Sequence, residues 1–242
     1  TQFLGIELAP LHVPLTRRLQ TLGVMYHFLF IFLLPVLVLL FVFWLWFAGH
    51  YFFIAAYIAW WWWDWDSPKQ GAYSSQYLRR AGFHRWLCAF FPMRVHATAH
   101  LPCDKNYLIG IHPHGIISIS AYNFFGNGTG IMDLFPSINF HICTLVGQFY
   151  FPLRREWMLL HGMINVSKDS LRYVLGGPLT GQAAVLIVGG AEEALNANPG
   201  KYVLTLNARK GFIKMALETG AHLIPCFGFG ENDVYVQASN KE

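Results

Sequence analysis

Two histidines separated by a single proline directly follow an apolar segment. The motif His112-Pro113-His114-Gly115 comes immediately after Tyr107–Ile111. Imidazole has an unperturbed pKa of about 6.5, which suits proton transfer near neutrality. Residues two apart on an extended chain share a face, so both rings can point into one pocket. The motif is therefore compatible with general-base chemistry or with a pair of metal ligands.

Apolar segments bounded by glycine indicate the strands and helices that would position this motif. Their alternation along the chain predicts an α/β domain with a mostly parallel sheet. The strands are expected at Asn106–Ile111, Ala183–Val188 and His222–Phe227, and the helices at Glu156–His161, at 168–176 after an N-cap at Ser167, and at Ala208–Thr219.

Three glycine-containing segments follow the expected strands. They are His114-Gly115, Gly189–Glu193 and Gly228–Glu231, and each carries a titratable residue. In parallel sheets the ligand crevice lies beyond the carboxyl ends of the strands, so we expect these segments to meet there. The chain contains no GxSxG motif, which argues against a covalent serine mechanism.

The composition indicates that part of the chain faces something other than water. Of the 242 residues, 55% are hydrophobic and only 12% are charged, whereas soluble domains average about 25% charged residues. The net charge of +4 is spread too thinly for a nucleic-acid site. The cysteines are far apart and form no CxxC motif, which fits a reducing compartment; they are Cys88, Cys103, Cys143 and Cys226.

The missing charge is concentrated between Leu19 and Trp63, where no Lys, Arg, Asp or Glu occurs. A membrane helix needs about 20 apolar residues, so this segment predicts a hairpin with legs at Leu22–Phe47 and Tyr51–Trp63, the second leg short. Trp60–Trp63 resembles the aromatic belt of a membrane interface. A signal peptide is excluded by the length and by the lack of a cleavage site, while a buried helix pair in a soluble protein stays open.

The chain divides into four expected parts. These are an N-terminal cytosolic segment at 1–21, a membrane hairpin at 22–63, an amphipathic interfacial connector at 64–100, and a globular domain at 101–242. Basic residues on both flanks of the hairpin place both ends in the cytosol. The connector is expected to form a basic amphipathic helix on anionic lipid, in which apolar residues alternate with Arg79, Arg80, His84 and Arg85; an ordinary surface helix is the alternative.

Several short blocks occur in a fixed order from about Ser67 to the end of the chain. Because of these blocks and their order, the sequence resembles the diacylglycerol acyltransferase type 2 family, which includes monoacylglycerol and wax-alcohol acyltransferases. Its more distant similarity to glycerolipid acyltransferases implies their α/β fold, and makes 101–242 an acyltransferase domain. The blocks are His112–Gly115, Val188–Leu195, Pro199-Gly200, Asn207–Phe212, Pro225 and Phe229–Asp233.

The chain departs from the family pattern at three places. Phe90-Phe91-Pro92 stands where the family commonly has Tyr-Phe-Pro, and the chain ends at Glu242 although the family continues, so we expect a C-terminal truncation. Glycerolipid acyltransferases carry an aspartate five residues after the histidine, where this chain has isoleucine. Glu193 or Glu231 is expected to replace that acid.

The resemblance implies direct transfer of a fatty acyl group from acyl-CoA to the hydroxyl of a neutral lipid alcohol, most simply diacylglycerol or monoacylglycerol. His114 is expected to be the base, His112 to hold the loop or bind the acyl carbonyl, and Glu193 to orient the base. The remaining substrate-binding candidates are backbone N–H groups at Gly115, Gly189 and Gly190, Arg209 and Lys210 for the coenzyme phosphates, and Glu231.

The resemblance also implies the partners and location of the protein. No cofactor is expected, acyl-CoA being a co-substrate, and the partners are the acceptor alcohol and the lipid bilayer, with no nucleic acid. The expected location is the endoplasmic reticulum membrane, multi-pass, with the catalytic domain in the cytosol. Lipid-droplet association, self-association and the identity of the acceptor stay open.

Two alternatives from other functional classes stay open at this point. A metal-dependent membrane hydrolase or hydroxylase would use His112 and His114 as ligands and would need further ligands at metal spacing. A non-catalytic membrane scaffold would retain its function when His114 is replaced.

Overall fold

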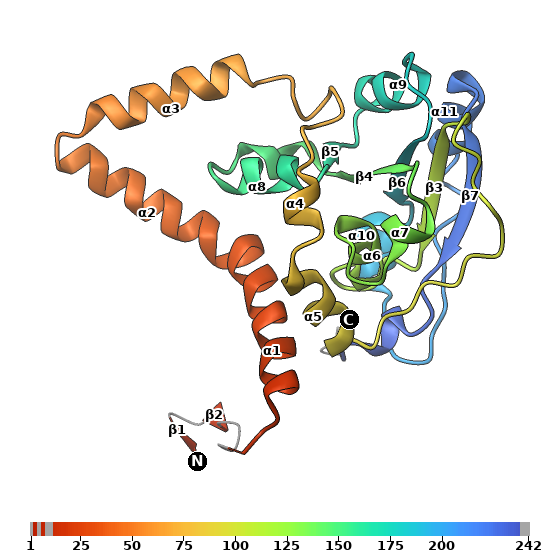
Figure 1. The fold of residues 1–242 in the computed structure, drawn as a ribbon, viewed down its shortest axis with the longest axis horizontal. Coiled ribbons are helices and arrows are strands. Elements are labelled where there is room, and N and C mark those ends of the chain that lie inside the picture. Colours follow the sequence, from red (N-terminus) through yellow and green to blue (C-terminus); the bar gives the residue numbers. More distant parts are fainter. Residues whose placement is uncertain (1, 4–5, 8–11, 238–242) are drawn as a thin grey trace.

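The central element of the protein is a five-stranded parallel sheet. The computed structural model describes residues 2–3, 6–7 and 12–237, and Figure 1 shows the sheet on the opposite side of the molecule from the N-terminal helices. The strand order is β5-β4-β6-β3-β7, with every neighbouring pair parallel. The strands are β3 (Tyr107–His112), β4 (Asn139–Thr144), β5 (Ile164–Asn165), β6 (Gln182–Ile187) and β7 (His222–Phe227).

Helices cover both faces of the sheet, because successive residues of a strand point to opposite faces. Ile109 and Ile111 belong to one buried hydrophobic cluster, which also contains residues of helices α6, α7 and α8. Leu108 belongs to a second buried cluster, which also contains residues of α9 and α11. The mixed α/β domain with a parallel sheet is confirmed. The helices are α6 (Tyr122–Phe125), α7 (Ile131–Leu134), α8 (Arg154–Leu160), α9 (Lys168–Gly176), α10 (Gly190–Leu195) and α11 (Gly211–Thr219).

The expected elements agree closely with the observed ones. The strand at His222–Phe227 is confirmed residue for residue, and the other two are displaced by one residue. Ser167 caps α9 by accepting a hydrogen bond from the N–H of Ser170 at 3.2 Å. The strands β4 and β5 were not expected. In β4 the buried His141 interrupts the apolar pattern, and β5 has only two residues.

A long apolar helix dominates the N-terminal region. It runs from Leu15 to Phe47 and is long and apolar enough to cross a membrane. It consists of α1 (Leu15–Phe28), a π-helical turn (Leu29–Leu33) and α2 (Leu34–Phe47). The π-helical turn ends two residues before Pro35, which has no N–H to donate. The apolar helix is confirmed, and it begins seven residues before the expected leg.

The next helix, α3 (Tyr51–Trp63), has 13 residues and joins α2 through Gly49. At 1.5 Å per residue it is roughly 20 Å long, shorter than the hydrocarbon core of about 30 Å. Most of its side chains are exposed. Figure 1 shows α2 and α3 as two legs that meet away from the α/β domain.

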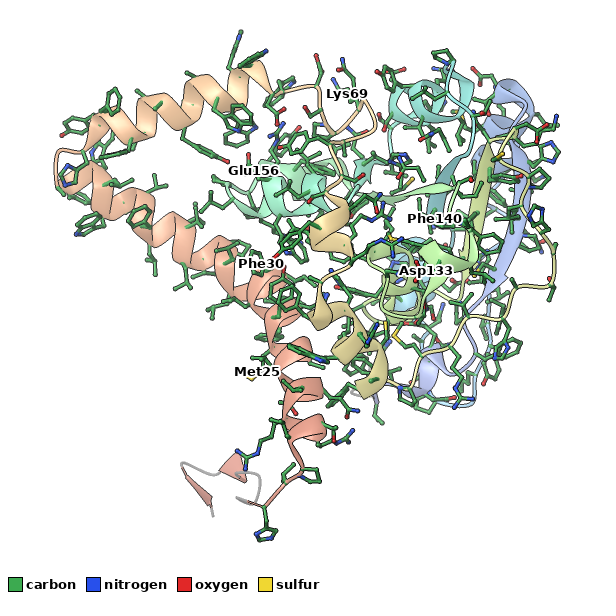
Figure 2. All side chains as sticks on the ribbon, in the orientation of Figure 1. Met25, Phe30, Lys69, Asp133, Phe140 and Glu156 are labelled. Atoms are coloured by element: carbon green, nitrogen blue, oxygen red, sulfur yellow. The ribbon has the colours of Figure 1, made fainter. Side chains whose placement is uncertain are left out.

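The long helix is anchored to the α/β domain by its first half. A Cβ added at Gly23 would come within 3 Å of Trp86, Leu87 and Phe83, so only glycine allows α1 to approach α5 (Gly82–Phe90) so closely. In Figure 2, Phe30 lies on the side of the helix that faces the domain and Met25 on the opposite side.

The segment between the long apolar helix and the sheet contains α4 (Gln76–Arg79) and α5, and Tyr77 is exposed. Arg79 and His84, two of the basic residues of the expected amphipathic helix, are instead buried. Arg79 donates to the carbonyls of Phe124 and Phe140 at 2.9 and 3.1 Å, and these bonds compensate for its lost hydration.

A buried polar cluster joins α3 to α8. Arg155 is 1% exposed and contacts Asp64 at 2.5 Å and Glu156 at 3.2 Å. The hydroxyl of Tyr57, on α3, donates to Glu156 at 2.9 Å, and Figure 2 places Glu156 on α8, in the region that faces α3. Both apolar helices are therefore fixed to the domain by contacts outside the sheet.

Candidate active site

The carboxyl ends of three adjacent strands form one edge of the sheet. β3 lies between β6 and β7, with Ile111 opposite Ile187 and His112 opposite Phe227. His112 is the last residue of β3, and the glycine-rich segments follow β6 and β7. The structure thus brings the three segments together, as expected from a parallel sheet.

His112 forms a buried pair with Glu193 of α10. Its Nδ1 lies 3.0 Å from Oε1 and 3.3 Å from Oε2 of the carboxylate, which is 1% exposed. Because an ionised carboxylate only accepts hydrogen bonds, we assign the ring proton to Nδ1 and the lone pair to Nε2. Nε2 is buried and has no hydrogen-bond partner among the described residues.

The Glu193 carboxylate also organises the main chain around the pair. It accepts hydrogen bonds from the N–H of His114 at 2.6 Å and of Thr205 at 3.0 Å. A Cβ at Gly189 would overlap this carboxylate, so a larger residue there would displace it. Glu193 therefore contacts the ring of His112 and only the backbone of His114.

The ring of His114 is half-buried and held by its own loop. Its Nδ1 lies 2.9 Å from the carbonyl of Gly115 and 3.2 Å from the hydroxyl of Ser118. A carbonyl accepts, so Nδ1 donates and the lone pair is on Nε2. Ser118 adopts a φ of 56°, a conformation that costs a non-glycine residue about 1–3 kcal/mol and is common at functional sites.

Glu231, in the short helical turn that follows β7, anchors this loop. Its carboxylate accepts from the N–H groups of Ile119 at 2.8 Å and Ser120 at 2.6 Å, and from the Ser120 hydroxyl at 2.5 Å. A Cβ at Gly115 would overlap it. Burial raises the pKa of Glu231, and these hydrogen bonds partly offset that effect. Its contacts are therefore to the loop that carries His114.

Arg209 lies beside the histidine–glutamate pair, and Lys210 lies next to it in sequence. The guanidinium of Arg209 is 3.4 Å from the carbonyl of Gly189 and 3.3 Å from the carboxylate of Glu192. Lys210 is exposed and immediately precedes α11. Gly190, at a φ of 64°, has open space where a side chain would be. This places two cations and a bare stretch of backbone at the edge of the sheet.

Other polar groups that sequence reasoning missed lie away from this edge. His27, His84 and His161 form a buried cluster among aromatic rings. A weak signal for this cluster is that His27 lies in the segment Leu19–Trp63, which has no Lys, Arg, Asp or Glu. Among the described residues, no group of three or more His, Cys, Asp or Glu side chains is arranged to hold a metal ion.

Two hollows on the surface are distinct from the candidate site. One of about 510 Å³ lies beside α4 and α5, and one of about 100 Å³ lies between the end of α3 and Phe149. Neither is lined by His112, His114 or Glu193. The pair instead lies under the loop that contains Thr205.

Comparisons with known proteins identify the family of the chain. Residues 43–242 match the family described as Diacylglycerol acyltransferase. The chain is 38% identical to 2-acylglycerol O-acyltransferase 1 of Bos taurus, over 98% of this chain and 71% of the relative. It is 42% identical to 2-acylglycerol O-acyltransferase 3 of Homo sapiens, over 76% of this chain and 54% of the relative. It is also 42% identical to Diacylglycerol O-acyltransferase 2A of Umbelopsis ramanniana, over 97% of this chain and 66% of the relative. No solved structure matches.

The family match at 43–242 includes every element of the candidate site, and the three relatives cover between 76% and 98% of the chain. The chain spans between 54% and 71% of the length of these three relatives. The alternatives of a metal-dependent hydrolase and a scaffold find no support among them. This chain belongs to the diacylglycerol acyltransferase family.

Proposed function

We propose that the protein transfers a fatty acyl group from acyl-CoA to the hydroxyl of diacylglycerol or monoacylglycerol. Family membership and the names of the relatives, all O-acyltransferases of acylglycerols, support this reaction. The observation that carries it is the buried Nε2 of His112, which faces no partner while Nδ1 donates to Glu193. An acceptor hydroxyl is the donor that this nitrogen lacks.

In the proposed mechanism His112 is the general base. Its Nε2 takes the proton of the acceptor hydroxyl, and the resulting oxygen attacks the thioester carbonyl carbon. The tetrahedral intermediate collapses with cleavage of the C–S bond, and the coenzyme thiolate leaves with the proton that Nε2 holds. Glu193 fixes the ring and stabilises the transient imidazolium.

The neighbouring groups supply binding and charge stabilisation. Backbone N–H groups at Gly115 and at Gly189-Gly190 are the proposed oxyanion donors. Arg209 and Lys210 would bind the phosphates of the coenzyme. Glu231 acts through the loop it anchors and not by contact with substrate. The reaction needs no cofactor beyond the acyl-CoA substrate.

A second assignment makes His114 the base. Its ring is half-exposed, and its Nε2 carries the lone pair because Nδ1 donates to the carbonyl of Gly115. In this version the His112–Glu193 pair would position the backbone of His114 through the 2.6 Å hydrogen bond to its N–H.

Acyl transfer in microsomes that lack their own neutral-lipid acyltransferases tests the reaction and the assignment. Labelled oleoyl-CoA would be offered with diacylglycerol, monoacylglycerol or a long-chain alcohol to the wild-type chain, His112→Ala and His114→Ala at matched protein levels. We expect ester formation to fall about 10²–10⁴-fold in His112→Ala and less in His114→Ala. The reverse order assigns the base to His114, and no ester from the wild-type chain would contradict the proposed reaction.

We further propose that α2 and α3 form a hairpin in the endoplasmic reticulum membrane, with the α/β domain on the cytosolic leaflet. The 33-residue helix is long enough to span, and the shorter α3 would enter only part of the bilayer. Product esters dissolve in the bilayer, so a site held at its surface has both substrates within reach.

The exposed thiol of Cys103 reports this orientation. In sealed microsomes with their cytosolic face outward, we expect a membrane-impermeant maleimide to label the wild-type chain and not Cys103→Ser. Labelling only after the vesicles are opened would place the domain in the lumen.

A further inference from the structure

The loop that crosses the His112–Glu193 pair is pinned at three points. The N–H of Thr205 donates to Glu193 at 3.0 Å. The N–H of Gly200 donates to the carboxylate of Asp233 at 2.9 Å, and the amide of Asn232 donates to the carbonyl of Lys201 at 2.7 Å. The loop between α10 and α11 therefore has a fixed position over the candidate site.

The side chains of this pinned segment are apolar and exposed. Tyr202 is 51% exposed, and its ring lies 6.1 Å from that of Phe227, which in turn lies 4.8 Å from Phe229. A contiguous apolar surface of this kind marks a binding site more often than isolated exposed residues do. We call this surface the apolar patch; it comprises Tyr202, Val203, Leu204, Leu206, Phe227 and Phe229.

The other end of the same loop is cationic. Arg209 contacts the carbonyl of Gly189, and Lys210 is exposed beside it. Thr205, whose N–H donates a hydrogen bond to Glu193, lies within the apolar stretch 202–206. Arg209 and Lys210 follow this stretch in the sequence. A ligand that fits this order has an anionic end, a reactive centre and a hydrocarbon tail. A fatty acyl-CoA has all three, whereas a neutral acceptor lacks the anionic end.

We propose that the apolar patch binds the hydrocarbon chain of the fatty acyl-CoA and sets the chain length that the enzyme prefers. This inference rests on the proposed acyl-transfer function. With the coenzyme phosphates at Arg209 and Lys210 and the thioester carbonyl at the histidine pair, the tail leaves the site along Tyr202 and Leu206. Its burial removes apolar area of both partners from water.

The preference between long and short acyl donors tests this proposal. We would measure kcat/KM for oleoyl-CoA and octanoyl-CoA with one acceptor, for the wild-type chain, Tyr202→Ser and Leu206→Ser. The matched control is Leu217→Ser, which changes an exposed leucine of α11 outside the patch. We expect the ratio of oleoyl to octanoyl kcat/KM to fall about tenfold in each patch variant and to stay unchanged in the control.

Two results would overturn the proposal while leaving acyl transfer intact. One is an unchanged kcat/KM for both donors in both patch variants. The other is an equal loss of kcat/KM for both donors, which would assign the patch to folding or to contact with the membrane. A wild-type chain without activity toward either donor would instead contradict the proposed function itself, so the two failures are distinguishable.

Discussion

Histidines gather at two places in this protein, and their surroundings differ in one decisive respect. At the edge of the sheet, His112 faces the carboxylate of Glu193. In the cluster formed by His27, His84 and His161, each ring hydrogen-bonds to a backbone carbonyl, and no carboxylate of the described residues hydrogen-bonds to any of them. Of these rings, only that of His112 has a carboxylate as its hydrogen-bond partner within the described part of the chain.

The electrostatics of the buried cluster are those of neutral rings. Burial, reinforced by the neighbouring histidines and Arg79, lowers the pKa of His84 to about 3. Burial also lowers the pKa of His161 to about 4, and the ring of Phe125 stacks on it at 4.2 Å. These rings stay neutral and serve as flat, apolar surfaces that join α1, α5 and α8. We therefore give the proposed catalytic role to the histidine with a carboxylate neighbour and not to the buried cluster.

The largest expected effect comes from removing the carboxylate of the His112–Glu193 pair, so that His112, like the histidines of the buried cluster, has no carboxylate partner. Glu193→Gln keeps the size of the side chain but removes the negative charge and offers an N–H to His112. Because the wrong tautomer is then stabilised, we expect kcat/KM for acyl transfer to fall about 10³-fold. Glu231→Gln is the matched control, since that carboxylate contacts no histidine ring. Equal losses in both variants would mean that Glu193 acts only through the loops.

Acid should unfold the protein through the buried cluster. The folded-state pKa values of His84 and His161 lie below the ordinary value of about 6.5, so the unfolded chain binds their protons more tightly. The stability is fully present above about pH 6.5 and is lost as the pH falls toward the folded-state values. At pH 5 we expect each histidine to lower the free energy of unfolding by about 2 kcal/mol.

Thermal unfolding in detergent between pH 7.5 and pH 5 measures this dependence. His161→Asn removes one of the two titrating rings, so its loss of stability with acid should be shallower than that of the wild-type chain. If the two curves have the same slope, the acid sensitivity arises elsewhere.

The smallest effect is expected from changing the ring that packs on His161. Phe125 is 2% exposed, and Phe125→Leu removes the stacking contact while keeping the site apolar. We expect the free energy of unfolding to fall by about 1–2 kcal/mol, with the kcat of the remaining folded protein unchanged. A large loss of kcat at full stability would link this cluster to the reaction after all.

The histidine motif, the glycine-rich segments and the apolar helix could be predicted from sequence because each is a local pattern. A strand that ends directly before His112 and an apolar helix through Phe47 are visible in periodicity and composition. The convergence of the three segments also followed, since parallel strands present their carboxyl ends together. The strand β4 escaped prediction because His141, inside it, is buried beside Gln182.

Only the tertiary structure decided which acid serves which histidine. The sequence offered Glu193 and Glu231 as replacement acids, with Glu193 expected to orient His114. The fold instead brings Glu193 to the ring of His112, 81 positions earlier, and Glu231 to the loop of His114. The fold likewise buried Arg79, whose partners are distant backbone carbonyls. The periodicity of apolar residues predicts which side chains are buried, because that pattern is set by neighbouring residues along the chain. The partner of a buried polar group depends on how separate elements pack, and this packing is fixed only when the sheet and its helices are assembled.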